Sequence, residues 1–395
     1  MLEGKTVILG VSGSIAAYKT AYLASALVKL HADVHVIMTK NAENFINPIT
    51  FETLTGNKCL TDTFDRDFEF DVKHVSLGQK ADIMIIAPAS ANVIGKMAHG
   101  IADDMLTTTV LSATCPIYVS PAMNTKMYEK AIVQENLQKL KENKINVIEP
   151  ASGYLACGDT GKGKMPEPDI LKEYILMEIG ADKDLAGKNI LISAGPTREA
   201  VDPVRFISNH STGKMGYALS HEAAMRGANV TLVTGPVSFE PPIGIEVINV
   251  TSAKEMHDGL MDTYDKADAV IMAAAVADYR PKTVSSEKIK KSDDSAAIEL
   301  ERTDDILMEM GQKKMHQILC GFSMETENVI ENSRGKLEKK NLDMIVVNNL
   351  RTEGAGFGTD TNVVTIIDKN GENPLPKASK HEVSKKVLDR IAQML

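Results

Sequence analysis

The stretches KTVILGVSG (Lys5–Gly13) and KNILISAGP (Lys188–Pro196) decide the fold expected for this chain of 395 residues. Each begins with a lysine, continues as a short apolar run and ends in a glycine turn. An apolar run of this length, closed by glycine, is typical of a strand that is buried on both faces. Because the pattern occurs near the start and again near the middle, the sequence predicts two domains that each open with such a strand.

Similar apolar runs follow both openings, with helical stretches between them. In the first half they are DVHVIMT, ADIMIIAPAS, PIYVSPAM and INVIEP, and in the second half NVTLVTG, ADAVIMAAAV, HQILCGFS, DMIVVNN and NVVTIID. This alternation predicts an α/β fold of two doubly wound, Rossmann-like parallel-sheet domains, which bind ligands at the carboxyl ends of their strands. Charge, glycine and alanine interrupt the alternation at 177–189, so we place the boundary near residue 185, giving domains 1–185 and 186–395.

Composition argues against a membrane-spanning or nucleic-acid-binding protein. Hydrophobic residues make up 43% of the chain and charged residues 25%, and no apolar run reaches the roughly 18 residues of a membrane helix. The formal charge of −9 disfavours nucleic acid as a partner, because neutralising phosphates needs a basic face. The N-terminus turns to glycine too early for a signal peptide, so we expect a cytoplasmic protein. Four cysteines without a C-x-x-C pair argue against disulfides and zinc.

The stretch GYLACGDTGKGKMPEPD (Gly153–Asp169) comes close to a phosphate-binding loop. Counted from Gly158, Gly163 and Lys164 satisfy the spacing G-x-x-x-x-G-K, but Met165 stands where that motif needs a hydroxyl for magnesium. We also expect the two prolines that follow to keep a helix from starting cleanly here. The glycines therefore serve another purpose.

GVSGSIAAYK places Gly13 and Ser14 between the first strand and the following helix. The exposed N–H groups and the helix dipole at such a junction suit a phosphate monoester. The second strand ends at Thr39 with no acidic residue to hold a ribose, so a mononucleotide such as FMN fits better than NAD. A simple tight turn is the alternative interpretation of this loop.

Two further segments of the first half follow predicted strands. In APASANVIGKMAHGIADD the small residues would let backbone approach a flat ligand, and Ser90 and Asn92 could hydrogen-bond its polar edge; close helix packing is the alternative. Asn124, which ends SPAMN, is a neutral amide that can orient a carboxylate without neutralising it. Such an arrangement suits decarboxylation, because a charge-paired carboxylate would resist leaving as CO₂.

The first half closely resembles the flavin-dependent cysteine decarboxylases, and among them the phosphopantothenoylcysteine decarboxylases, over nearly all of residues 1–180. A lone histidine or cysteine is usually structural or inert. Here, however, the family's order and spacing are matched by five segments: GSI, His74, PASANVIGKMAHGIADD, PAMN and the Cys157 loop. The resemblance implies a flavodoxin-like fold with FMN. The residues that it implies for FMN binding are Gly13, Ser14, Ile15, Thr39, Ser90 and Asn92.

The same resemblance implies a mechanism. FMN would oxidise the substrate's cysteinyl thiol to a thioaldehyde with His74 assisting, and Asn124 would hold the carboxylate that leaves as CO₂. Reduced FMN would then return the hydride to the enethiolate, and Cys157 would supply the final proton. The glycine-rich segment around Cys157 would be a mobile clamp over the substrate. Lys164 stands where the family usually has arginine. The lysine keeps the positive charge but cannot make the bidentate contact of an arginine.

In the second half, polar residues gather after the first strand and after the fourth. The segment 193–216 leads into a helix expected to start near Gly213, and it contains Arg198, Arg205, Asn209 and Lys214. Asp278 lies at the tip of the fourth strand, and KIKK (Lys288–Lys291) follows in a polar loop. In an otherwise acidic chain these residues favour a polyphosphate ligand, with solvated loop charge as the alternative.

This half closely resembles the phosphopantothenate–cysteine ligases over essentially residues 188–395, on AGPTRE, DPVRFISNHSTGKMG, AAAVAD, KIKK, GFSMET and KLEKKNLD. The bacterial ligases activate 4′-phosphopantothenate with CTP as an acyl-cytidylate, which L-cysteine then attacks. Carried over, Asn209 would act on the acyl-cytidylate and Lys288 would stabilise developing charge. The residues implied for CTP binding are Asp278, Lys288, Asp305, Ile306, Phe322, Lys336 and Lys340. Mg²⁺ would accompany CTP, with ligands unknown, and Asp304 replaces the family's usual proline.

Together the resemblances imply a bifunctional enzyme of coenzyme A biosynthesis, in which the ligase product is the substrate of the decarboxylase. They imply small-molecule partners and a homo-oligomer, a dodecamer built from flavin-domain trimers and ligase-domain dimers. A peptide cysteine decarboxylase on the same scaffold and a catalytically inactive flavin-binding regulator are the alternatives. His74, Asn124 and Cys157 are all present and a ligase half is attached, so we rank both below the bifunctional enzyme.

Overall fold

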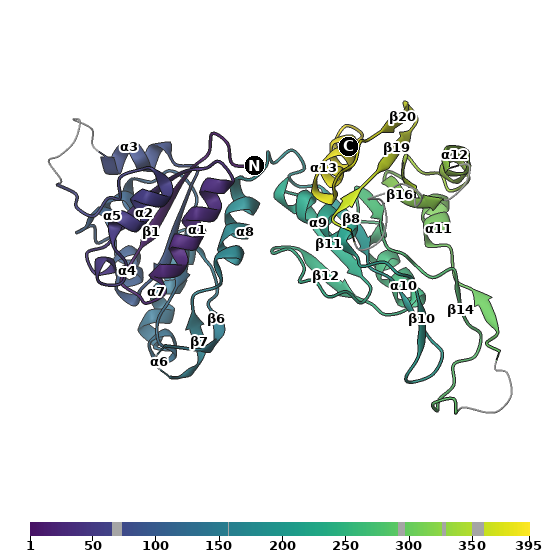
Figure 1. The fold of residues 1–395 in the computed structure, drawn as a ribbon, viewed down its shortest axis with the longest axis horizontal. Coiled ribbons are helices and arrows are strands. Elements are labelled where there is room, and N and C mark those ends of the chain that lie inside the picture. Colours follow the sequence, from purple (N-terminus) through teal and green to yellow (C-terminus); the bar gives the residue numbers. More distant parts are fainter. Residues whose placement is uncertain (65–72, 157, 291–296, 326–328, 350–358) are drawn as a thin grey trace. The chain divides into compact units, whose positions relative to one another are not determined.

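The computed structural model describes residues 1–64, 73–156, 158–290, 297–325, 329–349 and 359–395. It divides into two compact units, Met1–Ala181 and Asp182–Leu395 (Figure 1). The boundary predicted near residue 185 lies four residues beyond this division.

Unit 1 contains a five-stranded parallel sheet in the order β2-β1-β3-β4-β5. The elements of unit 1 are β1 (Thr6–Val11), α1 (Ala17–Lys29), β2 (Asp33–Met38), η1 (Ala42–Asn44), α2 (Pro48–Thr55), α3 (Lys73–Lys80), β3 (Ile83–Ala89), α4 (Ala91–Ala98), α5 (Met105–Ser112), β4 (Ile117–Pro121), α6 (Thr125–Tyr128), α7 (Ala131–Glu142), β5 (Asn146–Val147), β6 (Ala151–Tyr154), β7 (Thr160–Lys164) and α8 (Pro168–Ile179). The strand order is flavodoxin-like and reverses between β1 and β3, so ligands are expected at the carboxyl ends of these two strands.

Helices cover both faces of this sheet, as its apolar strands require. Every residue of β1 and β3 is buried. Residues of α3, α4, α5 and α7 share a core with Ile8, Met84 and Val119 on one face. The helices α1 and α8 pack together against the sheet on the other face (Figure 1).

An antiparallel hairpin, β6–β7, and the helix α8 complete unit 1. Pro168 is the first residue of α8, so the expectation that prolines keep a helix from starting here is wrong. The first helical position tolerates proline because its N–H would have no partner within the helix. Gly163 and Lys164 lie inside β7 rather than between a strand and a helix, which agrees with rejecting a phosphate-binding loop.

Unit 2 contains an eight-stranded sheet in the order β12-β11-β8-β13-β16-β17-β19-β20. The elements of unit 2 are β8 (Asn189–Ala194), β9 (Arg198–Ala200), β10 (Phe206–Ser208), α9 (Lys214–Met225), β11 (Asn229–Thr234), β12 (Glu246–Asn249), α10 (Ala253–Tyr264), β13 (Ala269–Met272), β14 (Tyr279–Pro281), β15 (Leu300–Arg302), α11 (Ile306–Lys313), β16 (Ile318–Glu325), α12 (Val329–Lys339), β17 (Met344–Asn349), β18 (Thr361–Asn362), β19 (Val364–Asp368), β20 (Gly371–Pro374), β21 (Ala378–Ser379) and α13 (Lys380–Ala392).

The first six strands of this sheet are parallel and have the Rossmann order, so the predicted doubly wound α/β fold is confirmed. The order reverses between β8 and β13. Two antiparallel strands, β19 and β20, extend one edge of the sheet. The apolar run NVVTIID predicts β19, whereas β20 has no such run. The helices α9 and α13 share one core on one face, and α10 and α11 share another with the opposite face.

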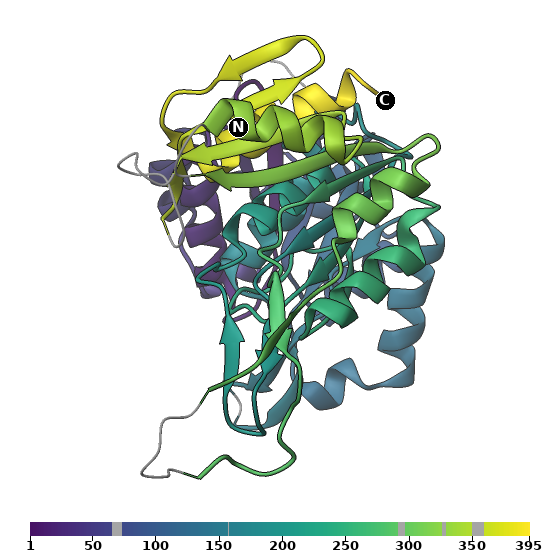
Figure 2. The ribbon, with the colours of Figure 1, turned by 90° about the vertical axis from the view of Figure 1, so that its right-hand side faces the viewer.

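Two short β-pairs extend away from this sheet, β9–β10 and β14–β15 (Figure 2). They lie side by side, because β14 contacts β9 and the N–H of Ser285 donates to the carbonyl of Val201 (3.1 Å). We call these two pairs and their connecting residues the arm of unit 2. Among the described residues, no helix is long and apolar enough to cross a membrane.

Candidate active sites

In unit 1 the ends of β1 and β3 are joined at the point where the strand order reverses. The buried hydroxyl of Ser12 donates to the carbonyl of Pro88 (2.7 Å) and accepts from the N–H of Ser90 (2.8 Å). The N–H of Thr39, just past β2, donates to the carbonyl of Val11, the last residue of β1 (2.9 Å). Four residues predicted to bind FMN therefore share one edge of the sheet: Gly13, Ser14, Thr39 and Ser90.

Two helix N-termini border this edge. The helix α1 starts shortly after Ser14, and α4 starts after Ser90, which accepts a hydrogen bond from the N–H of Val93 (3.5 Å). The first N–H groups of a helix have no partners within it and lie at the positive end of its dipole. These groups fit the phosphate of FMN, and exposed Ile15 and Asn92 lie beside the two turns.

The β6–β7 hairpin packs against the turn that contains Asn124. The Nδ2 of Asn124 donates to Oδ2 of Asp159, between the two strands of the hairpin, at 2.8 Å. Gly163 is required here because its φ is +134° and an added Cβ would overlap the carbonyl oxygen of Met123. The hairpin thus carries the segment predicted to be a clamp directly to Asn124. Cys157 itself lies outside the described residues.

His74 lies at the opposite edge of the sheet. It is the second residue of α3, which ends three positions before β3 begins. Its carbonyl accepts a hydrogen bond from the hydroxyl of Ser112 (2.5 Å), at the end of α5 and ahead of β4. Figure 1 shows α3 at the end of unit 1 opposite the hairpin. Within one chain, the structure does not bring His74 and Asn124 together.

The three described cysteines have the surroundings of packing residues. Cys59 and Cys320 are buried and Cys115 is partly buried. Burial raises the pKa of Cys59 to about 12, and it also raises the pKa of Cys115 and of Cys320. None of these thiols is therefore prepared to ionise near neutral pH.

Unit 2 contains a cleft of about 880 Å³ at the carboxyl ends of β13, β16 and β17 and the start of α9. Seven residues predicted for the ligase line it: Asn209, Asp278, Asp305, Ile306, Phe322, Lys336 and Lys340. Most of them come from loops far apart in the sequence, which the strand order brings to one edge.

The floor of this cleft is the segment 273–278, whose backbone is fixed from two sides. The buried hydroxyls of Ser193 and Thr197 accept from the N–H groups of Ala274 (3.1 Å) and Ala277 (3.0 Å). Above the segment, Nδ2 of Asn209 donates to the carbonyls of Ala275 (3.0 Å) and Val276 (3.3 Å). Asn209 is thereby held in a defined orientation at the cleft.

One wall of the cleft carries the lysines predicted to contact nucleotide phosphates. Lys340 forms an ion pair with Asp305 (2.8 Å), which also caps α11 by accepting from the N–H of Met308 (3.1 Å). Lys336 of α12 donates to the hydroxyl of Ser323 (3.3 Å). These contacts group Asp305, Lys336 and Lys340 on the same side of the sheet.

Lys288 is not among the residues that line the cleft. It lies in the arm, where its neighbour Ile289 is bound to the turn after β9. The N–H of Ile289 donates to Asp202 (3.2 Å), and its carbonyl accepts from Arg205 (2.9 Å). Hydrogen bonding by the Arg205 guanidinium keeps the pKa of Asp202 well below its usual range. Lys288 therefore belongs to the arm and does not line the cleft of its own chain.

The cleft also contains residues that the sequence analysis did not assign to it. They include Arg302, Asn348, Asn362 and Lys380. Lys214, which the sequence places among loop residues that favour an anionic ligand, lines the cleft as well. One signal was available for Lys380. It occupies the same helical face as Val383, Val387 and Ile391, which is the buried face of α13. A lysine in an apolar register is a candidate for a functional role.

No group of three or more His, Cys, Asp or Glu side chains in the described part of the chain is arranged to hold a metal ion. The nearest acidic residues at the cleft are Asp278, Asp304 and Asp305, and Asp305 is already paired with Lys340.

Both halves of the chain match known families. Residues 1–180 match the flavoprotein family, and residues 185–395 match the DNA/pantothenate metabolism flavoprotein C-terminal domain. The coenzyme A biosynthesis bifunctional protein CoaBC of Bacillus subtilis is 49% identical over 400 residues, covering 100% of this chain and 98% of that protein. This chain belongs to the CoaBC family. The prediction of a bifunctional enzyme of coenzyme A biosynthesis is thereby confirmed.

Two solved structures each resemble one half of this CoaBC chain. The crystal structure of a CoaBC C-terminal domain is 44% identical, covers 54% of this chain and 98% of its own, and has a TM-score of 0.47. A PPC decarboxylase mutant complexed with pantothenoylaminoethenethiol is 30% identical, covers 45% of this chain and 99% of its own, and has a TM-score of 0.40.

Proposed function

We propose that residues 1–185 carry an FMN-dependent phosphopantothenoylcysteine decarboxylase and residues 186–395 a CTP-dependent phosphopantothenate–cysteine ligase. The observation that carries this proposal is the cleft of unit 2, where seven residues predicted from separate motifs line one space. The product of the ligase, 4′-phosphopantothenoyl-L-cysteine, is the substrate of the decarboxylase, and the final product is 4′-phosphopantetheine.

In the ligase reaction, the carboxylate of 4′-phosphopantothenate attacks the α-phosphorus of CTP and pyrophosphate leaves. The amine of cysteine then attacks the acyl-cytidylate and displaces CMP. Asp278 and Phe322 bind cytidine, while Lys336 and Lys340 neutralise phosphates. Because Nδ2 of Asn209 is engaged by two carbonyls, its Oδ1 is the atom with which it orients the cysteine amine. Mg²⁺ would accompany CTP, and the triphosphate would supply its ligands.

In the decarboxylase reaction, Gly13, Ser14, Ile15, Thr39, Ser90 and Asn92 hold FMN. FMN, when bound, would supply the two-electron oxidation of the substrate thiol that makes loss of CO₂ feasible, and it would return the two electrons to the product after CO₂ has left. Asn124 binds the substrate carboxylate through a neutral amide, so it orients the group without stabilising it as a full ion pair would. The hairpin excludes water from the site and carries Cys157, the proton donor.

We also propose that the protein is a homo-oligomer, a dodecamer built from trimers of unit 1 and dimers of unit 2. Two observations support shared sites. His74 and Asn124 lie at opposite edges of one sheet, so a neighbouring copy must supply one of them. Lys288 lies on the arm, whose side chains Val204, Phe206 and Tyr279 are largely exposed apolar groups. Native mass spectrometry checks this assembly, and a monomer with both activities would refute it.

A single incubation tests the two activities. Purified protein is mixed with 4′-phosphopantothenate, L-cysteine, CTP and Mg²⁺, and the products are identified by mass spectrometry beside an absorbance spectrum. We expect 4′-phosphopantetheine, CMP and a flavin spectrum. Accumulation of 4′-phosphopantothenoyl-L-cysteine would contradict the decarboxylase assignment. No turnover by a folded flavin-bearing protein would favour the regulator alternative. Free cysteine and a cysteine-terminated peptide serve as alternative substrates for the decarboxylase.

The variant Asn209→Ala separates the two steps of ligation. We expect it to form the acyl-cytidylate from CTP, because activation does not use the cysteine amine, and to pass it poorly to cysteine. Pyrophosphate release without amide formation is the expected measurement. Wild-type ligation by this variant would reject the role of Asn209.

A further inference from the structure

The contact between Asn124 and Asp159 joins two segments that the proposed decarboxylase reaction needs together. Nδ2 of Asn124 donates to Oδ2 of Asp159 at 2.8 Å, although the two residues are 35 positions apart in the sequence. Asn124 is proposed to bind the substrate carboxylate. Asp159 follows Cys157, the proposed proton donor, by two residues in the sequence. The proposed function assigns no role to Asp159 itself.

The amide of Asn124 is held at both ends. Its Oδ1 accepts from the N–H of Lys126 (2.8 Å), while its Nδ2 donates to Asp159. The first contact decides which end of the amide carries the oxygen, and the two contacts together define the plane of the amide group. Both N–H groups of Nδ2 lie in this plane, so the direction of each is set. Asp159 therefore helps to decide where Asn124 can donate to a substrate carboxylate.

The loop that carries Asp159 is closed by backbone hydrogen bonds. The N–H of Leu155 donates to the carbonyl of Asp159 (2.8 Å), and the N–H of Gly158 donates to the carbonyl of Leu155 (2.9 Å). Gly158 has a φ of +88°, a backbone conformation that favours glycine. The side chain of Asp159 therefore starts from a defined position at the tip of the hairpin.

Two contacts of β7 attach the hairpin to the rest of unit 1 away from its tip. The N–H of Met123 donates to the carbonyl of Gly163 (3.0 Å). Lys162 forms an ion pair with Glu149 at 3.2 Å, and both side chains are about half exposed. The strands of the hairpin are thus attached separately, and the contact of Asp159 with Asn124 places the tip.

We propose that Asp159 is a positioning residue of the decarboxylase, which sets the amide plane of Asn124 and holds the hairpin tip beside it. This inference rests on the proposed function. A misplacement of about 1 Å near a reacting group can cost roughly 100-fold in rate. Because the contact joins the segments of Asn124 and Cys157, it affects both the loss of CO₂ and the proton transfer that follows.

A single turnover of the full FMN-loaded chain with 4′-phosphopantothenoyl-L-cysteine, in the absence of oxygen, tests this assignment. CO₂ is measured from an isotope label in the substrate carboxyl group. 4′-Phosphopantetheine and its enethiol precursor, which has lost CO₂ but has not regained the hydride and the proton, are quantified by mass spectrometry. We expect Asp159→Ala to release CO₂ about tenfold more slowly and to leave a larger share of enethiol than the wild type.

Two further variants separate the hydrogen bond from other effects. In Asp159→Asn the new Oδ1 can still accept from Asn124, so we expect the rate of CO₂ release and the share of enethiol to stay within about threefold of the wild type. The control is Lys162→Met, which removes an exposed ion pair from the same hairpin and should change little.

The wild-type rate and products from Asp159→Ala would overturn the assignment. An Asp159→Asn variant as impaired as Asp159→Ala would overturn it as well, because charge and not the hydrogen bond would then matter. An equal loss in Lys162→Met would assign the effect to the hairpin as a whole and not to Asp159. The share of enethiol does not depend on the folded fraction, so it decides the result even if Asp159→Ala folds poorly. A wild type that releases no CO₂ would instead contradict the proposed function.

Discussion

Asn124 holds two parts of unit 1 in place with one amide group. Its Oδ1 accepts from the N–H of Lys126 (2.8 Å), which caps α6, and its Nδ2 donates to Asp159 of the hairpin (2.8 Å). A carboxylate of the same shape could keep the first contact but would repel Asp159. The identity of this residue therefore determines both substrate binding and the position of the hairpin.

We expect Asn124→Asp to lower decarboxylation by about two orders of magnitude, because the new charge repels Asp159 and the substrate carboxylate. Ligation should be unchanged, so 4′-phosphopantothenoyl-L-cysteine should accumulate in the coupled assay. The control is Asn143→Asp, the same change at an exposed position. Normal yields of 4′-phosphopantetheine from Asn124→Asp would contradict this role.

Lys19 of α1 provides a second test at the residue scale. It is only 6% exposed, and its Nζ donates to the carbonyl of Met165 (3.2 Å) and to Glu167 (2.8 Å). Replacing it with methionine leaves a buried carbonyl without a donor, at a cost of about 1–3 kcal/mol. We expect Lys19→Met to lower the melting temperature of unit 1 by roughly 2–10 °C.

Flavin release and circular dichroism during heating measure this effect. Lys29→Met, an exposed lysine of the same helix, is the control and should change little. If Lys19→Met has the melting temperature of the wild type, the segment between β7 and α8 is held in place without this contact.

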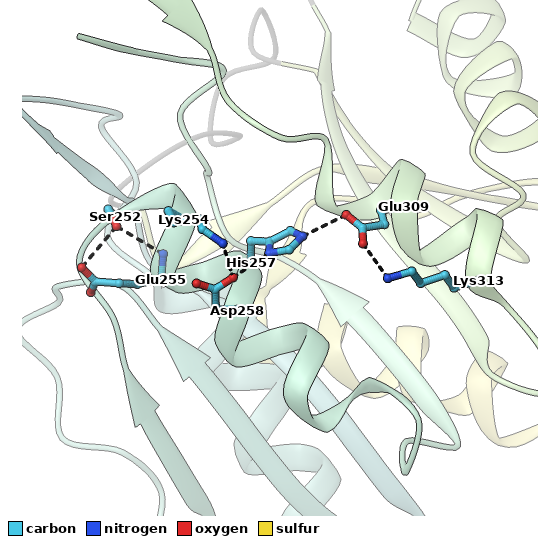
Figure 3. Close-up of polar contacts among 7 residues, drawn as sticks. All are labelled: Ser252, Lys254, Glu255, His257, Asp258, Glu309 and Lys313. Atoms are coloured by element: carbon cyan, nitrogen blue, oxygen red, sulfur yellow. Dashed lines mark hydrogen bonds and ion pairs between the residues drawn. The ribbon is translucent and has the colours of Figure 1, made fainter. Parts of the chain in front are cut away.

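At the scale of elements, α10 and α11 are joined by a histidine. His257 of α10 lies between Asp258 (3.0 Å) and Glu309 of α11 (2.9 Å), and Lys254 and Lys313 pair with these two carboxylates (Figure 3). Because α11 begins at the cleft with Asp305 as its cap, this contact helps to fix the nucleotide wall.

The charge of His257 makes this contact sensitive to pH. Burial opposes protonation, but hydrogen bonds with Asp258 and Glu309 outweigh it and raise the pKa of His257 above its usual 6.5. A raised folded-state pKa gives stability that is complete below the unfolded-state value and is lost as the pH rises through the folded-state value. The α10–α11 contact should therefore weaken above neutral pH.

We expect His257→Gln to lower the melting temperature of unit 2 by a few degrees at about pH 6 and by less at about pH 9. Differential scanning calorimetry over this range provides the measurement. His316→Gln, at an exposed histidine of the same unit, should show no such trend. If the melting temperature of His257→Gln is lowered by the same amount at every pH, packing and not charge accounts for the contribution of His257 to stability.

At the scale of the whole molecule, the described hydrophobic cores do not cross the division between the units. One core is made of residues from Ile8 to Leu140, and the cores of unit 2 begin at Leu185 and Leu191. Each unit also contains a complete sheet. Two units with separate cores are expected to fold independently.

We therefore expect residues 1–181 and 182–395, produced separately, to fold and to keep one activity each. The flavin absorbance should follow the first piece, and CTP-dependent ligation the second. A mixture of the two should still form 4′-phosphopantetheine, because the intermediate can pass through solution. A piece that folds only when joined to the other would contradict the separation of the cores.

Much of this architecture was predictable because strand and helix patterns are local. The apolar runs located most strands of both sheets, and Gly213 correctly marked the start of α9. The half-exposed strand β12 and the short strands of the arm were missed, because they lack a continuous apolar run. Pro168 was misjudged because its effect depends on where in a helix it stands, which only the structure shows.

The sequence by itself determined two α/β units, their ligand-binding edges and the motifs that indicate both activities, since these depend on residue order and short-range periodicity. Only the tertiary structure decided which side chains meet. It brought Lys380 and Asn348 into the cleft with Lys214, and it placed Lys288 on the arm and His74 at the far edge of its sheet. The physical reason is that strand order, set by long-range pairing, decides which loops share an edge, and no local pattern records that order.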